Sequence, residues 1–397
     1  MRVGIFHNRY IHRGGEDAVV DAQAELLRKD GHTVLLFQVD NRDEISGSAV
    51  GAVRAGLRAR WNPRIGERVG AILDREFIDV GHVHNFFPLL TPAVHQALYD
   101  RGIPVVQTLH NYRLICANGL LLRSGGPCDD CVVRGPWNAV RHGCYRGSRL
   151  QTAVWAEQTA LHRRRRTWHR LVDRFTTPSE FARGKLLEAG LPENRLVVQP
   201  NPVRDPGEPR FGGRGAVYVG RLSREKGVHL LLAAWRRLDG LPLAIVGSGP
   251  EEDSLRRQAL DLPGVRFVGE RDRDGVIAAL AAAAFAVAPS IAFETFGLAV
   301  AEAMACGTPS IVPADSALAG LVDHGRSGLH FASGDPVALA QACRRIAENP
   351  ADAERMGREA RADYEESLSP AVARDALVSL YEQVVRDAPA RAWRRGQ

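Results

Sequence analysis

Two basic side chains that could hold a diphosphate stand close together in the segment GRLSREKG, residues 220–227. Arg221 follows a predicted strand, and Lys226 precedes a predicted helix, VHLLLAAWRRL. The free N–H groups and the positive dipole end of a helix N-terminus attract an anion, and two fixed cations add to this attraction. The spacing therefore favours a diphosphate site, although two solvated charges on a surface loop would give the same pattern.

Two carboxylates that could bind a sugar, Glu294 and Glu302, are separated by seven residues in the segment FETFGLAVAEAMACGTP. Gly297 is predicted to open a helix whose N–H groups can face an anion. Glu294 would then lie on the preceding loop, with Glu302 about one and a half turns inside the helix. Carboxylate oxygens accept hydrogen bonds from sugar hydroxyls, so the pair suits a sugar ligand, while a solvated helix face explains the same spacing.

Glycines at two predicted strand ends could bring the backbone close to a phosphate. Gly14 and Gly15 follow the first predicted strand, and Gly247 stands in VGSGP at 246–250. Glycine lets backbone N–H groups approach a bound anion, although an ordinary tight turn uses the same residues. The G-x-G-x-x-G pattern of dinucleotide-binding proteins does not follow the first strand.

The six cysteines divide into a group of four and two single residues. The group lies in the segment 110–148, with eleven, two and twelve residues between its successive members Cys116, Cys128, Cys131 and Cys144. This spacing suits a structural zinc site with tetrahedral thiolate ligands, and His142 could replace one cysteine. Free reduced thiols are the alternative, and disulfides are least expected in a cytosolic protein. Cys306 and Cys343 are predicted to be small buried residues.

Short β-branched runs alternate with longer helical patterns along most of the chain, which predicts parallel sheets covered by helices on both faces. The segment DPGEPRFGGRG, 205–215, is the predicted linker. We therefore predict an α/β protein with two doubly wound domains and a ligand cleft at the carboxyl ends of their strands. The predicted strands are 2–6, 33–39, 79–84, 104–110, 171–178, 195–200, 216–220, 241–247, 265–269, 285–290 and 308–313.

Composition excludes several classes of protein. The 397 residues include 52 basic and 46 acidic side chains, and 45% are hydrophobic, which excludes a disordered or disulfide-stapled chain. Only three of the basic residues are lysines, so the arginine run 163–166 is weak evidence for nucleic acid, and we expect no nucleic-acid partner. The longest apolar run, 276–289, is well short of the ~20 residues that cross a bilayer. With no secretory signal predicted, we expect a cytoplasmic protein.

Taken in order, these motifs resemble those of the retaining glycosyltransferases of family 4, which have the GT-B fold of two Rossmann-like domains. The resemblance covers roughly residues 1–385 and includes four shorter segments, PSEF (178–181), QPNPV (199–203), FVGE (267–270) and APS (288–290). It implies an N-terminal acceptor-binding domain at 1–203 and a C-terminal donor-binding domain at 204–370. A helix within 371–397 would cross back to the first domain.

The resemblance implies an activity. The protein would transfer a sugar from a nucleotide diphosphate donor, with UDP or GDP favoured, to a hydroxyl acceptor, and the anomeric configuration would be kept. The segment 110–148 resembles bacterial members of capsule, exopolysaccharide or natural-product pathways most closely. No catalytic metal is expected, because cationic side chains would stabilise the leaving group. A nucleotide-sugar epimerase, a sugar phosphorylase and a non-catalytic nucleotide-sugar binding protein are the alternatives on this fold.

The resemblance also implies roles for particular residues. Arg221 and Lys226 would neutralise the leaving diphosphate. Glu302 would hold the ribose hydroxyls, and Glu294 would bind hydroxyls of the donor sugar. His110 in TLHNY would lie at the sugar, although a core histidine that caps a strand is the alternative. The other donor-binding residues implied are Gly14, Gly15, Gly247, Val268, Phe296, Gly297 and Leu298.

A predicted helix at 151–170 combines apolar positions with a basic end. A lipid-linked acceptor would suit such a surface at the inner face of the cell membrane, in peripheral contact with it. A solvated helix in an arginine-rich protein explains the composition better, so this contact is the weaker expectation.

Overall fold

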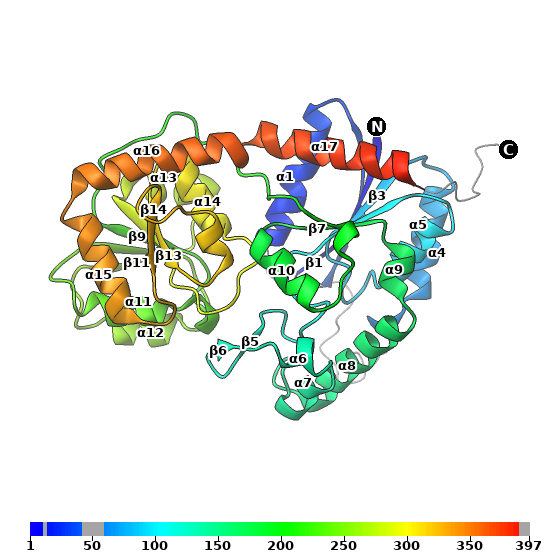
Figure 1. Ribbon diagram of the computed structural model, residues 1–397, viewed down its shortest axis with the longest axis horizontal. Helices are drawn as coiled ribbons and strands as arrows, with labels where there is room; N and C mark the ends of the chain where they lie inside the picture. Colours follow the sequence, from blue (N-terminus) through cyan, green and yellow to red (C-terminus); the bar gives the residue numbers. More distant parts are fainter. Residues whose placement is uncertain (11–13, 42–58, 389–397) are drawn as a thin grey trace.

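The computed structural model describes residues 1–10, 14–41 and 59–388. It contains two parallel six-stranded sheets, which lie in two domains side by side (Figure 1). The predicted fold class, two doubly wound α/β domains, is confirmed.

The N-terminal sheet has the strand order β2-β1-β3-β4-β7-β8, and every neighbouring pair is parallel. Successive side chains of a strand point to opposite faces, so Val105 and Val106 of β4 enter different cores. The strands are β1 (Arg2–Arg9), β2 (Thr33–Asp40), β3 (Val80–Val83), β4 (Val105–Thr108), β7 (Arg174–Thr177) and β8 (Leu196–Val198).

Helices cover both faces of this sheet. One face packs against α1 and the C-terminal helix α17, while the other packs against α4, α5 and α10. The helices of this domain are α1 (Gly15–Lys29), α4 (Pro63–Leu73), α5 (Ala93–Tyr99), α6 (Asp130–Val133), α7 (Asn138–His142), α8 (Arg149–Arg164), α9 (Thr167–Leu171), α10 (Glu180–Glu188) and the 3-10 turn η1 (Glu193–Arg195).

The C-terminal sheet repeats this plan with the order β11-β10-β9-β12-β13-β14. One face packs against α11, α12 and α15, and the other packs against α13 and α14. Its strands are β9 (Ala216–Val219), β10 (Leu243–Val246), β11 (Val265–Gly269), β12 (Phe285–Val287), β13 (Ser310–Pro313) and β14 (Gly328–Phe331). Its helices are η2 (Arg224–Lys226), α11 (Val228–Trp235), α12 (Glu252–Gln258), α13 (Arg273–Ala282), α14 (Leu298–Ala305), η3 (Ala317–Gly320), α15 (Pro336–Ala347) and α16 (Pro350–Ser367).

The chain returns to the N-terminal domain through α17 (Pro370–Asp387) (Figure 1). Leu377, Leu380 and Val384 of this helix are buried against β1, β3 and α1. The predicted linker is anchored to α16, because Arg361 Nη1 lies 2.9 Å from Asp205 Oδ1. The C-terminal helix is therefore part of the core that supports the first sheet.

One predicted element is wrong, and one strand of the C-terminal sheet was not predicted. The single helix expected at 151–170 is two helices, α8 and α9, because Arg166 takes a left-handed conformation with φ 51° and the His162 ring bonds Thr167 Oγ1 at 3.0 Å across the turn. Strand β14 was not predicted, since its four residues GLHF form too short a run to show a period. None of the described helices combines the length and apolarity that a membrane crossing requires.

Candidate active site

The N-termini of α1 and α14 approach each other between the two domains. A Cβ atom placed on Gly15 would lie 3.9 Å from Leu298 Cδ2. Gly297 opens α14 with φ 104°, and a Cβ there would lie 2.1 Å from Leu318 Cδ2, so only glycine fits. The first residues of the two helices therefore lie close together, and helix N-termini with free N–H groups suit a ligand with phosphates.

Lys226 lies beside this place. Its Nζ donates to Glu294 Oε1 at 2.9 Å. The next residue, Gly227, turns the chain into α11 with φ 71°, and a Cβ there would lie 2.0 Å from the carbonyl oxygen of Pro289. Arg221 is exposed two residues after β9, and its side chain has no protein hydrogen bond within the described ranges. The structure thus leaves one cation free and ties the other to a carboxylate.

Glu294 is held in its charged form. Burial would raise the pKa of this carboxyl, but the Lys226 ammonium and the Ser290 hydroxyl, which donates to Glu294 Oε1, outweigh it and lower the pKa below its ordinary value. An ionised carboxylate accepts hydrogen bonds only, so Glu294 can bind ligand hydroxyls.

Glu302 has a different environment in α14. Only 9% of the residue is exposed, and burial raises its pKa to about 6 despite the charge of Arg273 nearby. Its carboxylate has no hydrogen-bond partner among the described residues. An incoming hydroxyl can therefore take up a hydrogen bond that the protein leaves unmade.

Gly247 and Val268 lie at the carboxyl ends of neighbouring strands. Gly247 follows β10, and its N–H donates to the carbonyl oxygen of Gly269 at 2.9 Å. A bulge in the pairing of β10 with β11 matches Ile245 to Phe267 and Val246 to Gly269, which leaves Val268 out of the register. A bulge frees backbone groups from the ladder, so this edge can offer main-chain hydrogen bonds to a flat ligand.

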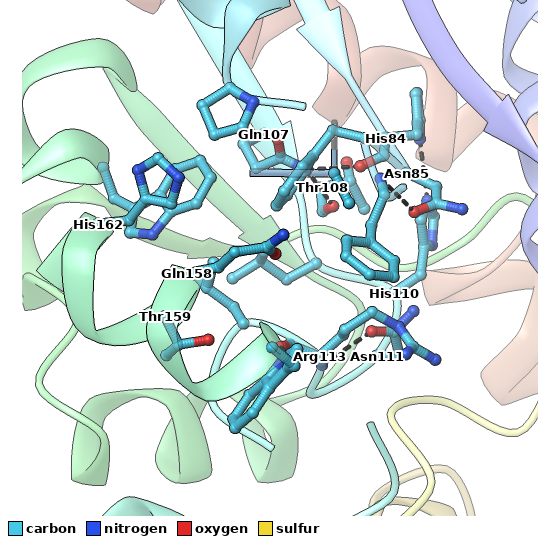
Figure 2. A pocket seen from close by; sticks show the side chains of 18 of the residues that line it. His84, Asn85, Gln107, Thr108, His110, Asn111, Arg113, Gln158, Thr159 and His162 are labelled. Atoms are coloured by element: carbon cyan, nitrogen blue, oxygen red, sulfur yellow. Dashed lines mark hydrogen bonds between the residues drawn. The ribbon is translucent and has the colours of Figure 1, made fainter. Parts of the chain in front are cut away.

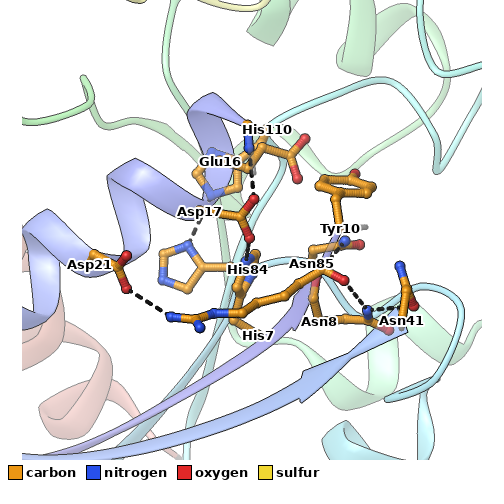
Figure 3. Close-up of polar contacts among 12 residues, drawn as sticks. His7, Asn8, Tyr10, Glu16, Asp17, Asp21, Asn41, His84, Asn85 and His110 are labelled. Atoms are coloured by element: carbon orange, nitrogen blue, oxygen red, sulfur yellow. Dashed lines mark hydrogen bonds and ion pairs between the residues drawn. The ribbon is translucent and has the colours of Figure 1, made fainter. Parts of the chain in front are cut away.

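His110 stands at the N-terminal side of the cleft, just after β4. Its Nε2 lies 2.9 Å from Nδ1 of His84, and the two rings stack (Figure 3). His84 also contacts His82, whose ring is tilted by 30° with its centroid 4.1 Å away. Burial, with help from His7 and His82, lowers the pKa of His110 to about 3. The ring is neutral at physiological pH and can exchange hydrogen bonds with a neutral ligand.

One loop of the C-terminal domain joins the two halves of the site. Thr295 Oγ1 donates to the carbonyl oxygen of His110 at 2.6 Å, and Ser179 Oγ donates to the carbonyl oxygen of Thr295 at 2.7 Å. Phe296, the next residue, is buried in the core around α14. Because Glu294 precedes Thr295, these bonds fix its distance from His110.

The residues beside His110 include several that the sequence analysis missed. Glu16, Asn111 and Arg113 line a pocket with His110, and Gln158 of α8 lines the same pocket (Figure 2). Asn111 Nδ2 donates to Glu16 Oε1 at 2.6 Å. Their positions gave a signal in the sequence, because Asn111 and Arg113 follow His110 in the segment HNYR and Glu16 follows Gly15. A single polar residue beside a motif, however, does not by itself indicate a site.

The four cysteines of the segment 110–148 gather near α6, α7 and α8, away from the helix N-termini. Burial raises the pKa of Cys131 to about 12, and the charges of the three other thiols add to this rise. All six cysteines are free thiols. Within the described ranges, no set of three or more His, Cys, Asp or Glu side chains is arranged as a metal site. Zinc binding stays a prediction. Cys306 and Cys343 are buried as expected.

Comparison with protein families assigns both halves of the chain. Residues 13–205 match the model described as Glycosyltransferase Family 4, and residues 210–363 match the model described as Glycosyl transferases group 1. The chain belongs to glycosyltransferase family 4, as the resemblance predicted.

Curated relatives match mainly in part. The chain is 41% identical over 160 residues to the glycogen synthase of Mycobacterium tuberculosis strain H37Rv, which covers 38% of each chain. It is 28% identical over 304 residues to D-inositol 3-phosphate glycosyltransferase 1 of Catenulispora acidiphila, covering 69% of this chain and 65% of that one. The chain thus spans about two fifths of the length of the first curated relatives it matches.

Solved structures match over almost the whole chain. HepE of Anabaena, solved with UDP and glucose, has a TM-score of 0.68 at 16% identity and covers 96% of this chain and 100% of its own. Sucrose-phosphate synthase of Thermosynechococcus elongatus has a TM-score of 0.72 at 18% identity, with coverage of 97% and 99%. The fold is therefore the predicted GT-B fold.

Proposed function

We propose that this protein is a retaining glycosyltransferase that moves a hexose from a nucleotide diphosphate sugar to a hydroxyl group of an acceptor. The observation that carries the proposal is the meeting of two helix N-termini, at Gly15 and Leu298, beside Lys226 and Glu294. This arrangement offers positive charge for a diphosphate and an ionised carboxylate for sugar hydroxyls within one cleft.

In the proposed reaction, the bond between the anomeric carbon and the diphosphate oxygen breaks while the acceptor oxygen bonds to the same carbon from the same face. The acceptor proton passes to the leaving phosphate oxygen, so the two products are the glycoside and the nucleoside diphosphate. Lys226, Arg221 and the two helix N-termini stabilise the negative charge that grows on the diphosphate. Glu294 orients the sugar, and neutral His110 offers it a hydrogen bond.

The proposal needs no catalytic metal, because Arg221, Lys226 and the two helix N-termini would supply the positive charge for the leaving group. Treatment with EDTA should leave the rate of nucleoside diphosphate release unchanged. A rate that falls and returns with Mg²⁺ or Mn²⁺ would contradict this part.

The donor nucleotide is proposed to be UDP or GDP. HepE was solved with UDP, and one relative from Mycobacterium tuberculosis is named as GDP-mannose-dependent, so both nucleotides occur among proteins similar to this chain. The edge at Gly247 and Val268 would receive the base through main-chain groups. Glu302, whose carboxylate is unpartnered among the described residues, would receive the ribose hydroxyls.

Thermal stability measured with UDP, GDP, ADP and TDP tests the proposal. A nucleotide at ~100 times its Kd adds about 2.7 kcal/mol to the native state. We expect UDP or GDP to stabilise the protein, and the Arg221→Ala and Glu302→Ala variants to lose this gain. The nucleotide sugar that corresponds to the stabilising nucleotide is then incubated with the protein in the absence of an acceptor. An epimerase would convert this donor into its epimer, whereas a transferase would not. No stabilisation by any nucleotide would overturn the proposal.

We also propose that the corner formed by α6, α7 and the start of α8 contacts an anionic membrane surface. Val133, Trp137 and Leu150 are 73%, 54% and 74% exposed there. The segment 129–150, which spans this corner, carries four arginines and two acidic residues, Asp129 and Asp130. Exposed aromatic and aliphatic side chains among cations suit a lipid interface. Co-sedimentation with phosphatidylglycerol vesicles should fall in Trp137→Ser and stay unchanged in the control Phe77→Ser, and equal binding of both variants would contradict the contact.

A further inference from the structure

The stacked rings of His84 and His110 each have one bonded and one unbonded nitrogen. Nδ1 of His84 and Nε2 of His110 lie 2.9 Å apart and form the bond between the rings (Figure 3). Nε2 of His84 is buried and has no partner among the described residues. Nδ1 of His110 also has no partner in the described part of the chain, but it is not buried, and its ring lines the pocket. Of the two unbonded nitrogens, that of His110 is therefore the one open to a ligand.

Neither ring carries a charge at neutral pH. Burial lowers the pKa of His84 well below its ordinary value and that of His110 to about 3. The nearby Asp17 carboxylate opposes this shift only weakly, and its oxygens are bonded to His7 Nε2 and to the N–H of Gly14, each at 2.8 Å. A neutral imidazole has one N–H donor and one acceptor nitrogen. One ring of the pair therefore donates to the other, and no third group shares this proton.

The unpaired Nε2 of His84 decides which ring donates. If this nitrogen carried the proton, a buried N–H would have no acceptor. Buried N–H groups without an acceptor are rarer in folded proteins than acceptors without a donor. The tautomer of a histidine is assigned from such a hydrogen-bond network. The proton of His84 is accordingly assigned to Nδ1, which donates to Nε2 of His110.

This assignment fixes the second proton as well. Nε2 of His110 accepts from His84, so the single proton of the neutral His110 ring must be on Nδ1. Nδ1 is the nitrogen that is open to a ligand. His110 therefore offers an N–H donor, which pairs with the oxygen of a hydroxyl group and cannot accept from a ligand N–H.

His84 itself is held firmly at the end of β3. Its backbone N–H donates to the carbonyl oxygen of Phe6 at 2.9 Å, and its own carbonyl oxygen accepts from Gln107 Nε2 at 2.6 Å. The ring packs beside His82, which is fixed in turn by the Tyr381 hydroxyl. Only 1% of His84 is exposed. The residue is thus too deep to touch a ligand but is well placed to hold its partner ring.

We propose that His84 is a positioning residue of the transfer reaction: its Nδ1–H fixes the orientation and tautomer of His110, so that His110 presents an N–H donor to an oxygen of the donor sugar. The proposal rests on the glycosyltransferase function proposed above. It assigns a direction to the hydrogen bond at His110, with the sugar oxygen as the acceptor.

NMR of protein labelled with ¹⁵N-histidine reads the tautomers directly, because protonated and bare ring nitrogens differ in ¹⁵N chemical shift and in their couplings to the ring protons. The signals of the two rings are assigned from those that disappear in His84→Leu and in His110→Gln. In the unmodified protein without ligand we expect both rings to carry their proton on Nδ1. A proton on Nε2 of His110 would overturn the proposal.

Two substitutions of His84 separate its hydrogen bond from its bulk. The amide N–H of His84→Asn can take the place of Nδ1–H, while His84→Leu has no donor. We expect His84→Asn to keep the proton of His110 on Nδ1 and His84→Leu to show both tautomers. An unchanged tautomer in His84→Leu would overturn the role of His84. The control His95→Leu removes a similarly buried histidine that bonds Gln107 instead, and it should leave His110 unchanged.

The effect on the sugar is measured by calorimetry as the affinity of UDP-glucose relative to UDP, and of GDP-mannose relative to GDP. His84→Leu should weaken the nucleotide sugar roughly five-fold through the loss of one hydrogen bond and leave the diphosphate unchanged. His84→Asn should restore most of this loss. Equal weakening of the nucleotide sugar and its diphosphate, or no weakening of either nucleotide sugar, would overturn the positioning role.

The two readouts also separate this proposal from the function on which it rests. If neither diphosphate binds the unmodified protein, the proposed function fails and the role of His84 at the sugar fails with it. If a diphosphate binds but the proton of His110 is on Nε2, the proposed function stands and the assignment of His84 is wrong.

Discussion

The two halves of the cleft are built on the same plan but carry different chemistry. In the C-terminal half, charged groups stand at the strand ends: Arg221 is exposed, and Lys226 holds Glu294 in its ionised form. In the N-terminal half, the strand ends carry stacked histidines whose charge is suppressed by burial. The comparison shows one sheet edge with ionised side chains and another at which burial keeps the side chains uncharged.

The structural support of the two halves differs as well. The charged groups of the C-terminal half lie on turns that begin helices of their own domain. The histidines of the N-terminal half are supported from behind by α17, whose Tyr381 hydroxyl lies 2.6 Å from His82 Nδ1. A substitution in the C-terminal half should therefore weaken ligand binding, while a substitution behind the histidines of the N-terminal half should lower the stability of the fold.

The largest expected effect is at Lys226. Removing one group that stabilises the leaving charge costs about 100- to 1,000-fold in rate. We expect Lys226→Ala to slow the release of nucleoside diphosphate from the donor by about this factor, measured with a coupled assay. The control Lys29→Ala removes an exposed lysine of α1 paired with Glu25 and should keep the normal rate. If Lys226→Ala keeps a rate close to that of the control, Lys226 does not stabilise the leaving diphosphate.

The second prediction concerns the cysteines. Four of them lie in one segment of the N-terminal domain, while the C-terminal domain holds two that are far apart in the sequence, Cys306 and Cys343. Protein purified without chelator should contain about one zinc per chain by mass spectrometry. Bound zinc at ~100 times its Kd would contribute about 2.7 kcal/mol to stability. Cys131→Ser should lower the metal content, while Cys306→Ala should leave it unchanged. A content below ~0.2 zinc per chain would contradict the prediction and favour free thiols.

Tyr381→Phe tests the support of the histidines. The variant leaves His82 Nδ1 buried without its partner, which should lower the free energy of unfolding by about 2 kcal/mol. Nucleotide binding should be unchanged, because the C-terminal half keeps its residues. Chemical denaturation and nucleotide titration check the two expectations, with the half-exposed Val385→Ala on the same helix as control. If Tyr381→Phe weakens nucleotide binding but leaves the free energy of unfolding unchanged, the N-terminal half contributes to nucleotide binding and the proposed division between the halves is wrong.

The smallest effect is the pH dependence at Glu302, whose pKa is raised from 4.5 to about 6. A raised folded pKa means that the native state holds the proton more tightly, so stability is fully present below pH 4.5 and is lost as pH rises through 6. The loss should amount to at most about 2 kcal/mol and should vanish in Glu302→Gln. Denaturation curves across this interval, with exposed Glu348→Gln as control, check the sign. If Glu302→Gln shows the same pH dependence of stability as the unmodified protein, the effect does not come from Glu302.

The sequence predicted the C-terminal half of the cleft more fully than the other half. The predicted residues of this half belong to two strand–turn–helix units: Arg221 and Lys226 to one, Glu294 and Glu302 to the other. The local sequence pattern of such a unit shows which residues lie on the turn and which lie in the helix. The structure then brings Lys226 to 2.9 Å from Glu294. In the N-terminal half the sequence pointed to His110 but not to Glu16, Arg113 or Gln158. These residues come from three elements, and no local pattern relates their positions.

The sequence by itself determined the two parallel sheets and the site of the cleft, because hydrophobic periodicity and glycine turns are local signals. Only the tertiary structure decided which polar atoms remain unpaired and which histidines lose their charge. Both properties depend on burial, and burial depends on the packing of segments far apart in the chain, as where β3 and β4 pack against α17.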